Sequence, residues 1–271
     1  MRVERALTAT VIAIVSPGSR LEAAETLSVL SDAAGVRPII ISLGDAAEPP
    51  HRDESGAMII DGLVPRYLDN AVASLRLSSL PAVAWWRAGD PDVLRGLATL
   101  VDRVVLDLVD PLPAWSLVPE VATLAPVTDI RWARLTRWRD LIARFFDLPE
   151  ARNSVWARLA IAGTDEHDAR LLAGWLQSRL PDGRAIQVVH ERRGAGALES
   201  VELTGAGGTM AVRLLPNGRC LETVSELRSG HAETRVVARG DEQLATLLGQ
   251  ELRVRSRDRA FEDAVRETER A

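Results

Sequence analysis

The stretch Thr8-Ala9-Thr10-Val11-Ile12-Ala13-Ile14-Val15 is a continuous apolar run that is rich in β-branched residues. Such a run predicts a strand that is buried on both faces, as in parallel sheets. Residues 21–34 follow with apolar side chains at helical spacing, and Gly35 is well suited to end that helix in a left-handed conformation. A second apolar strand is predicted at residues 37–43. The order strand, helix, strand predicts a parallel α/β unit.

The same alternation continues through the first half of the chain. Residues 45–55 contain Pro49-Pro50 and predict an exposed loop. Beyond it, strands are expected at 57–61, 82–86 and 103–108, and helices at 64–77 and 91–100. Prolines then exclude a long element until the strongest helix, which is expected at 129–146 with Thr128 as its N-cap. Its apolar face repeats at intervals of three and four residues through Trp132, Leu135, Trp138, Ile142 and Phe145.

The pattern changes after residue 150. A strand at 155–161 and a helix at 166–180 precede several β-like runs separated by Gly and Asn turns, at 185–190, 198–203, 210–214 and 234–238. Helices at 244–252 and 260–267 close the sequence. We therefore expect an α/β N-terminal domain over 1–150, with a largely parallel sheet and flanking helices. A smaller α+β C-terminal domain is expected over 151–271.

Composition limits the class of protein. Hydrophobic residues make up 46% and charged residues 26% of the 271, as in ordinary globular proteins. No apolar run approaches the roughly 18 residues of a membrane helix, and the start of the chain lacks a signal-peptide pattern. The single cysteine, Cys220, excludes an internal disulfide and fits a reducing compartment, so we expect a cytoplasmic protein without a membrane partner.

Charge and residue usage exclude several activities. All 33 basic residues are arginine, which leaves no lysine for a Schiff base or a phosphate-binding loop. The net charge of −5 argues against a nucleic-acid partner. The glycine-rich stretches at 194–196 and 205–208 occur late and between strands, which favours hairpin turns over a dinucleotide loop. The loop after the first strand has one glycine, Gly18, and predicts a turn and helix start, with an anion site as the alternative.

Metal and nucleophile patterns are equally weak. Asp165-Glu166-His167-Asp168 are consecutive and would fan out around a helix, which favours helix capping, by Thr164 and first-turn acids, over metal binding. The remaining histidines have no ligand spacing, and there is no Gly-x-Ser-x-Gly elbow. Cys220 beside Arg219 is more typical of packing than of a reactive thiol. We therefore expect no catalytic, cofactor-binding or metal-binding residue.

Two stretches hold four of the seven tryptophans: Leu-Pro-x-Val-x-Trp-Trp at 80–86 and Thr-Asp-x-x-Trp-x-Arg-Leu-x-x-Trp-Arg at 128–139. Between them lies Asp102-Arg103-Val104-Val105-Leu106-Asp107. In order and spacing these blocks resemble the OpcA family, the glucose-6-phosphate dehydrogenase assembly proteins, and the likeness covers nearly the whole chain. The motif residues, with a structural or partner-binding role, are Pro81, Trp85, Trp86, Asp102, Arg103, Asp107, Asp129, Trp132, Arg134, Leu135, Trp138 and Arg139.

The resemblance implies a non-catalytic protein that binds and activates glucose-6-phosphate dehydrogenase, the enzyme that opens the oxidative pentose phosphate pathway. Some relatives are associated with redox control through cysteine pairs, which a single Cys220 cannot form. The alternative is an enzyme or ligand-sensing protein of sugar or nucleotide metabolism. Its site would lie at the carboxyl ends of the N-terminal strands, with Asp107, Asp110 and His51 involved. For Arg134 and Arg139, we expect bracing contacts with carboxylates such as Asp107 or Asp129.

Overall fold

The computed structural model describes residues 6–180, 182–193 and 198–269. It divides into two compact units: unit 1 is Met1–Ala133 with Glu242–Asp258, and unit 2 is Arg134–Asp241 with Arg259–Ala271. This division differs from the expected 1–150 and 151–271 in two ways. The first part of unit 1 ends at Ala133, and unit 1 also includes the later segment Glu242–Asp258. The late segment belongs to unit 1 because Leu247 and Leu248 pack in its core.

Unit 1 is built on a seven-stranded sheet with the order β3-β4-β2-β1-β5-β6-β7. Every neighbouring pair is parallel except β3 and β4. The chain winds outward from β1 in one direction and then from β5 in the other, so the order reverses between β1 and β5. The strands are β1 (Ala9–Val15), β2 (Val36–Leu43), β3 (His51–Arg52), β4 (Met58–Leu63), β5 (Ala82–Trp86), β6 (Arg103–Leu106) and β7 (Val127–Asp129). β3 lies within the loop expected at 45–55.

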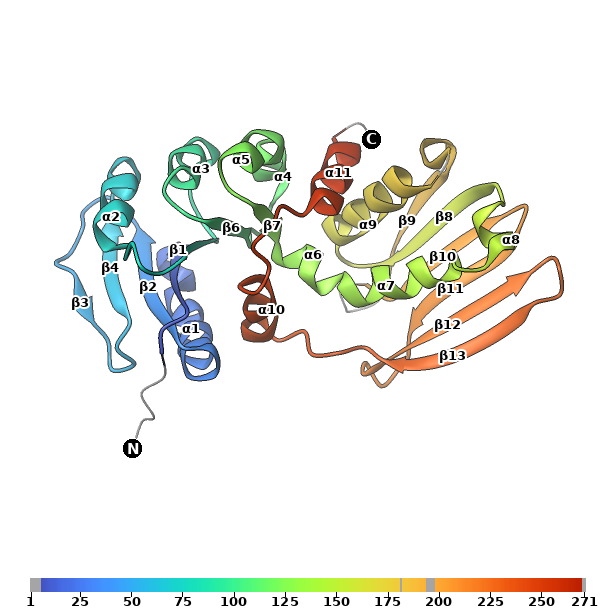
Figure 1. Cartoon of the computed structure of the whole chain (residues 1–271), viewed down its shortest axis with the longest axis horizontal. Helices are drawn as coiled ribbons and strands as arrows, with labels where there is room; N and C mark the ends of the chain where they lie inside the picture. The colour runs from blue at the N-terminus through green and yellow to red at the C-terminus, as the bar shows by residue number, and fades with distance from the viewer. Residues whose placement is uncertain (1–5, 181, 194–197, 270–271) are drawn as a thin grey trace. The chain divides into compact units, whose positions relative to one another are not determined.

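Helices cover both faces of this sheet, α1 and α10 on one side and α2, α3 and α5 on the other (Figure 1). On the first side, Val11 and Ala13 of β1 pack with Leu27 of α1, Leu248 of α10 and Trp85 of β5. Alternate residues of the strands face the opposite side. The helical segments are η1 (Pro17–Ser19), α1 (Arg20–Ala34), η2 (Pro65–Tyr67), α2 (Leu68–Leu75), α3 (Pro91–Ala98), α4 (Leu112–Trp115), α5 (Val118–Leu124) and α10 (Leu244–Glu251).

Sequence signals correctly predict the end of α1, but they do not predict how the helix expected at 129–146 begins or that it is interrupted. Gly35 ends α1 with φ 65° and ψ 41°, the left-handed cap that the sequence predicts. The expected helix at 129–146 is wrong as a single element: it is divided into α6 (Ile130–Arg134) and α7 (Thr136–Phe145). Thr128 lies in β7 and is not the cap. Asp129 takes that place, because its carboxylate accepts the backbone N–H of Arg131 at 2.8 Å.

Unit 2 is built on a six-stranded sheet with the order β13-β12-β11-β10-β8-β9, antiparallel except for the pair β8 and β9. The expected runs are present, with an additional strand, β12, to which the sequence pattern assigned no bounds. Its buried residues are Leu221, Thr223, Ser225 and Leu227, and the two hydroxyl side chains among them weaken the apolar signal. The strands are β8 (Trp156–Gly163), β9 (Gln187–Arg192), β10 (Ser200–Gly205), β11 (Gly208–Leu214), β12 (Cys220–Leu227) and β13 (Ala232–Ala238). The glycine turn expected at 194–196 lies outside the described residues.

The remaining helical segments of unit 2 are α8 (Pro149–Arg152), α9 (Glu166–Arg179), η3 (Gly183–Ala185) and α11 (Arg259–Thr268). The expectation that Thr164 caps α9 is corrected: Asp165 is the cap, and it accepts the N–H groups of His167 at 2.9 Å and Asp168 at 3.3 Å. Within the described residues, no helix combines the length and the apolarity needed to cross a membrane.

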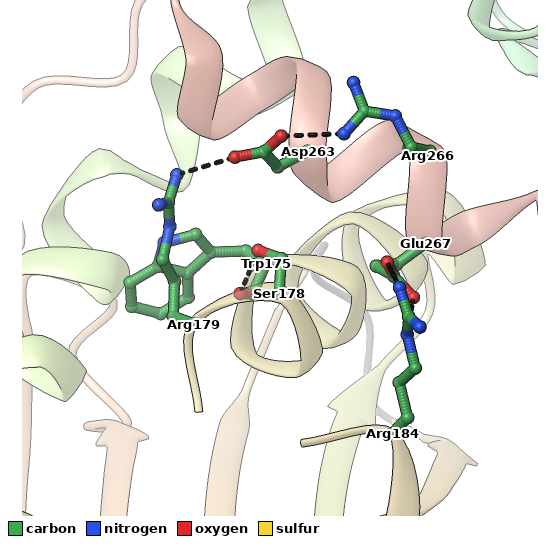
Figure 2. A network of polar contacts seen from close by, with 7 residues as sticks. All are labelled: Trp175, Ser178, Arg179, Arg184, Asp263, Arg266 and Glu267. Carbon is green, nitrogen blue, oxygen red and sulfur yellow. Dashed lines mark hydrogen bonds and ion pairs between the residues drawn. The ribbon is translucent and has the colours of Figure 1, made fainter. Parts of the chain in front are cut away.

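Helices α9 and α11 lie side by side, although Arg179 and Asp263, which pair across them, are 84 positions apart in sequence (Figure 2). Asp263 of α11 lies between two guanidiniums, at 3.3 Å from Arg179 of α9 and 2.8 Å from Arg266. Glu267 of α11 pairs with Arg184 of η3 at 2.6 Å. These pairs are partly exposed, so each contributes little. Both helices also bury apolar side chains, among them Leu172 of α9 and Phe261 of α11.

Gly174 permits the close approach of α9 to α11. A Cβ atom at this position would lie 2.3 Å from the carbonyl oxygen of Ala264. We expect Gly174→Ala to destabilise the chain by about 1–3 kcal/mol, because the backbone of α11 must move to relieve the overlap. Urea unfolding measures this change. Gly18→Ala is the control, since its Cβ would meet nothing within 4 Å. Equal stability of the two variants would contradict the tight packing.

Candidate functional site at the carboxyl edge of the parallel sheet

Open α/β sheets bind their ligands at the carboxyl ends of the strands, where the strand order reverses. In unit 1 this place holds Arg87, the residue after β5. Its Nε lies 2.9 Å from the carboxylate of Asp107, and its Nη2 lies 2.7 Å from the carboxylate of Glu22 in the first turn of α1. The guanidinium carbon lies over the indole of Trp85, 4.9 Å from the ring centroid. Only 13% of the Arg87 side chain is exposed. Arg87 is therefore nearly buried at this place and is held by two carboxylates of the chain itself.

The residues around the first turn of α1 do not fit a nicotinamide dinucleotide. A dinucleotide fingerprint needs glycines that let the pyrophosphate approach the helix amides. Here the loop after β1 contains only Gly18 and forms the short helical turn η1. The hydroxyls of Ser16 and Ser19 bond each other at 3.0 Å. Glu22, held by Arg87, supplies the negative charge that a phosphate would bring to this helix end.

Asp129 is a second buried group at this edge, at the end of β7. Its carboxylate accepts the indole N–H of Trp115 at 2.8 Å and the backbone N–H of Arg131 at 2.8 Å. Burial raises the pKa of Asp129 from 3.8 to about 7. The two hydrogen bonds and the charge of Arg131 oppose this shift in the pKa, whereas the nearby carboxylate of Asp107 adds to it. Asp129 therefore titrates near neutral pH inside the folded unit.

This raised pKa predicts a pH-dependent stability. The folded chain holds a proton on Asp129 that the unfolded chain releases above about pH 4. The resulting stabilisation is complete below pH 4 and is lost as the pH rises through 7. Relative to Asp129→Asn, which cannot ionise, the wild-type free energy of unfolding should fall by about 2–3 kcal/mol between pH 5 and pH 8, given a folded pKa of about 7.

Urea unfolding at both pH values tests this expectation. Asp110→Asn is the matched control, because Asp110 is an exposed carboxyl near the same edge, with its Oδ1 accepting the N–H of Leu112 at 3.2 Å. The control variant should keep the wild-type pH dependence. An Asp129→Asn profile parallel to the wild type would show that this carboxyl is ionised throughout.

The four tryptophans of the two motif stretches are buried. Trp85, Trp86, Trp132 and Trp138 are each at most 1% exposed. The indole N–H of Trp85 donates to Asp107 at 3.1 Å, and that of Trp132 donates to Asp258 at 2.7 Å. Direct contact with a partner needs exposed surface, so this burial favours the structural role for the motif tryptophans.

The structure gathers the other motif residues of unit 1 at two opposite edges of its sheet. Asp107 and Asp129 lie at the carboxyl edge. Pro81, Asp102 and Arg103 lie at the amino edge, where the carboxylate of Asp102 accepts the N–H of Ala82 at 2.7 Å. Arg103 is 3% exposed and forms an ion pair with Glu251 of α10.

The motif residues around the break between α6 and α7 are placed differently. Leu135 is buried, whereas Arg134 and Arg139 are half-buried, and Arg139 donates to the hydroxyl of Thr136 at 3.0 Å. The bracing of Arg134 and Arg139 against Asp107 or Asp129 stays a prediction. Cys220, at the start of β12, is a free thiol of intermediate exposure.

The constellation required by the alternative enzyme is not assembled in unit 1. His51 lies on β3 at the outer edge of the sheet, and four strands separate β3 from β6, which precedes Asp107 and Asp110. At about 4.8 Å per strand the separation is roughly 24 Å. In the described ranges no group of three His, Cys, Asp or Glu side chains could hold a metal ion. The sequence analysis did not predict the pairing of Arg87 with Glu22. The one local signal for Arg87 is its position directly after the Trp pair, and Glu22 has no such signal.

Solved structures share this fold. yvaA from Bacillus subtilis has a TM-score of 0.58 at 9% identity, covering 98% of this chain and 95% of that chain. An oxidoreductase from Sinorhizobium meliloti has a TM-score of 0.56 at 11% identity, covering 97% and 95%. The super-repressor mutant of Gal80p from Saccharomyces cerevisiae has a TM-score of 0.51 at 8% identity, covering 90% and 83%. At such identities the likeness concerns the fold alone, which these proteins combine with different functions.

Sequence comparison identifies the family. The model of the OpcA family, which describes the C-terminal domain of a glucose-6-phosphate dehydrogenase subunit, matches residues 125–265, more than half of the chain. The chain belongs to the OpcA family. Two curated relatives are named "Putative OxPP cycle protein OpcA". The one from Nostoc punctiforme is 29% identical over 132 residues, and the one from Synechocystis is 28% identical over 127. These matches cover 45% and 42% of this chain but only 27% and 26% of the relatives' own length.

Proposed function

We propose that this chain is a non-catalytic protein of the oxidative pentose phosphate cycle. It binds glucose-6-phosphate dehydrogenase, promotes the assembly of that enzyme and activates it. The observation that carries this proposal is the family match over residues 125–265, whose description names a subunit of that dehydrogenase. The names of the curated relatives, which refer to the same cycle, support it. The protein is proposed to act in the cytoplasm, since its single cysteine fits a reducing compartment.

The ion pairs of Arg87 at the carboxyl edge of unit 1 support the non-catalytic part of the proposal. Where a dehydrogenase of this fold would need open space, Arg87 pairs with Glu22 and Asp107. The chain also lacks lysine, so no ammonium is available as a base or phosphate ligand. The fold is thus used as a scaffold, while the hydride transfer belongs to the partner.

Activation by binding requires a difference in affinity. A protein that binds the active form of the dehydrogenase more tightly than the inactive form shifts the population towards the active form. A tenfold shift needs a preference of about 1.4 kcal/mol. The same coupling requires that ligands stabilising the active dehydrogenase also strengthen its complex with this chain.

The test uses the purified chain and the dehydrogenase from the same organism. Alone, the chain should not reduce NADP with glucose 6-phosphate. Mixed with the dehydrogenase, it should co-elute in size-exclusion chromatography and raise kcat/KM several-fold. Gly18→Ala is a suitable control, because its fold should be intact and its activation unchanged. Turnover by the chain alone would overturn the non-catalytic assignment, and failure to co-elute or activate would overturn the partnership.

A further inference from the structure

A groove of about 930 Å³ opens at the amino edge of the parallel sheet in unit 1, opposite the carboxyl edge. It is lined by the first residues of β1, β5 and β6, by the segment after α2 and by the segment after α10. Its size lies in the range of small-molecule sites. The charged side chains along it are Arg76, Asp102, Arg103, Arg253 and Arg255. Four guanidiniums against one carboxylate is an unusual balance in a chain whose net charge is −5.

Two of the four guanidiniums are committed to protein groups. Arg103 pairs with Glu251, and Arg76 donates to the carbonyl of Leu100 at 2.6 Å. Arg253 and Arg255 are exposed, and their guanidiniums bond no other side chain or carbonyl in the part of the chain that the structure describes. Two positive charges in this groove are therefore available to a ligand.

Further donors point to the class of ligand. Ser78 and Ser79 are exposed hydroxyls on the wall of the groove. α1 and α10 both end at this groove, and the dipole of each helix places about half a negative charge at its C-terminus. The two full positive charges of Arg253 and Arg255 exceed this sum. Guanidiniums beside hydroxyls match the oxygens of a phosphate group. Asp102 adds an acceptor for a hydroxyl of the same ligand.

We propose that this groove binds a phosphorylated small molecule that carries hydroxyl groups, with its phosphate held by Arg253 and Arg255. Ser78 and Ser79 donate to the phosphate oxygens, and Asp102 accepts from a ligand hydroxyl. The site is separate from the carboxyl edge and does not depend on a dehydrogenase partner. It would let a phosphorylated metabolite act on this chain itself.

Isothermal titration calorimetry on the full chain tests the proposal with glucose 6-phosphate, inorganic phosphate and glucose as probes. We expect saturable binding of glucose 6-phosphate, weaker binding of inorganic phosphate, and none of glucose. The affinity for glucose 6-phosphate should fall as salt rises, because the pairing charges are exposed. If neither phosphate probe binds saturably below about 10 mM, a value far above ordinary metabolite affinities, the proposal is wrong.

Variants locate the site. Replacing both Arg253 and Arg255 by alanine should raise the Kd for glucose 6-phosphate at least tenfold while leaving the circular dichroism spectrum and thermal unfolding unchanged. Arg66→Ala, an exposed arginine of the same unit whose guanidinium lies over Tyr67, should keep the wild-type Kd. Equal Kd values for the double variant and the wild type would place phosphate binding elsewhere and overturn the assignment.

Discussion

Arg103→Met should destabilise unit 1 by about 3–5 kcal/mol, because it removes the cation that pairs with the buried carboxylate of Glu251. The Arg103 and Glu251 side chains are only 4% and 10% exposed, and the two charged groups lie 2.5 Å apart. Arg103 Nη1 also reaches the carbonyl of Ser256 at 3.4 Å, so the substitution also removes a tie to the late segment of unit 1. Urea unfolding followed by tryptophan fluorescence measures the loss.

The double variant Arg103→Met with Glu251→Leu separates the charge effect from packing. Since a buried ion pair contributes little net stability over apolar side chains of similar volume, the double variant should recover most of the loss. Glu251→Leu alone should be strongly destabilising, because it leaves the buried guanidinium of Arg103 without the carboxylate with which it pairs. Additive losses in the double variant would mean that the two side chains act by packing and not as a pair.

Trp138→Ala should cost unit 2 about 3–5 kcal/mol, as expected for removal of a fully buried aromatic side chain. Trp138 is 1% exposed, and it lies on the buried face of α7 with Leu141 and Ile142. Few other substitutions in this helix should approach this effect, because its remaining side chains are smaller or more exposed.

Arg144→Ala on the same helix is the matched control. Arg144 is 60% exposed and pairs with Asp140 at 3.2 Å, an interaction expected to contribute no more than about 0.5 kcal/mol. Arg137 would be a poorer control than its helical position suggests, since it donates to the carbonyl of Ala238 at 3.2 Å. If Trp138→Ala unfolded like the wild type but no longer bound the dehydrogenase, the indole would be a partner contact and its burial assignment would be wrong.

Sequence patterns predicted the elements that depend on local information. The apolar run at 8–15 is β1, the expected strand at 82–86 coincides with β5, and Gly35 ends α1 in the left-handed conformation. In each case the signal is carried by neighbouring residues: a continuous apolar run, a Leu-Pro entry, or the backbone freedom of glycine.

Features that depend on distant residues were not predicted. The break between α6 and α7 interrupts an apolar spacing that continues through Leu135, so periodicity alone could not locate it. Arg87 contacts Glu22, 65 positions away, and the spacing of charged residues gives no sign of this pairing. The return of α10 to unit 1 was also hidden, because the pattern of Leu247 and Leu248 indicates a buried face but not the sheet that covers it.

The late arrival of α10 has a consequence for biosynthesis. β1, β2 and α1 leave the ribosome before α10, because Leu247 and Leu248, which cover the same side of the sheet, follow about 200 residues later. At roughly 5–20 residues per second this delay amounts to about 10–40 s. During that time the nascent chain presents an uncovered apolar strip near Leu27 and Leu30, against which Leu247 and Leu248 later pack. A chaperone that shields this strip during translation should therefore raise the yield of folded protein more than one supplied after release.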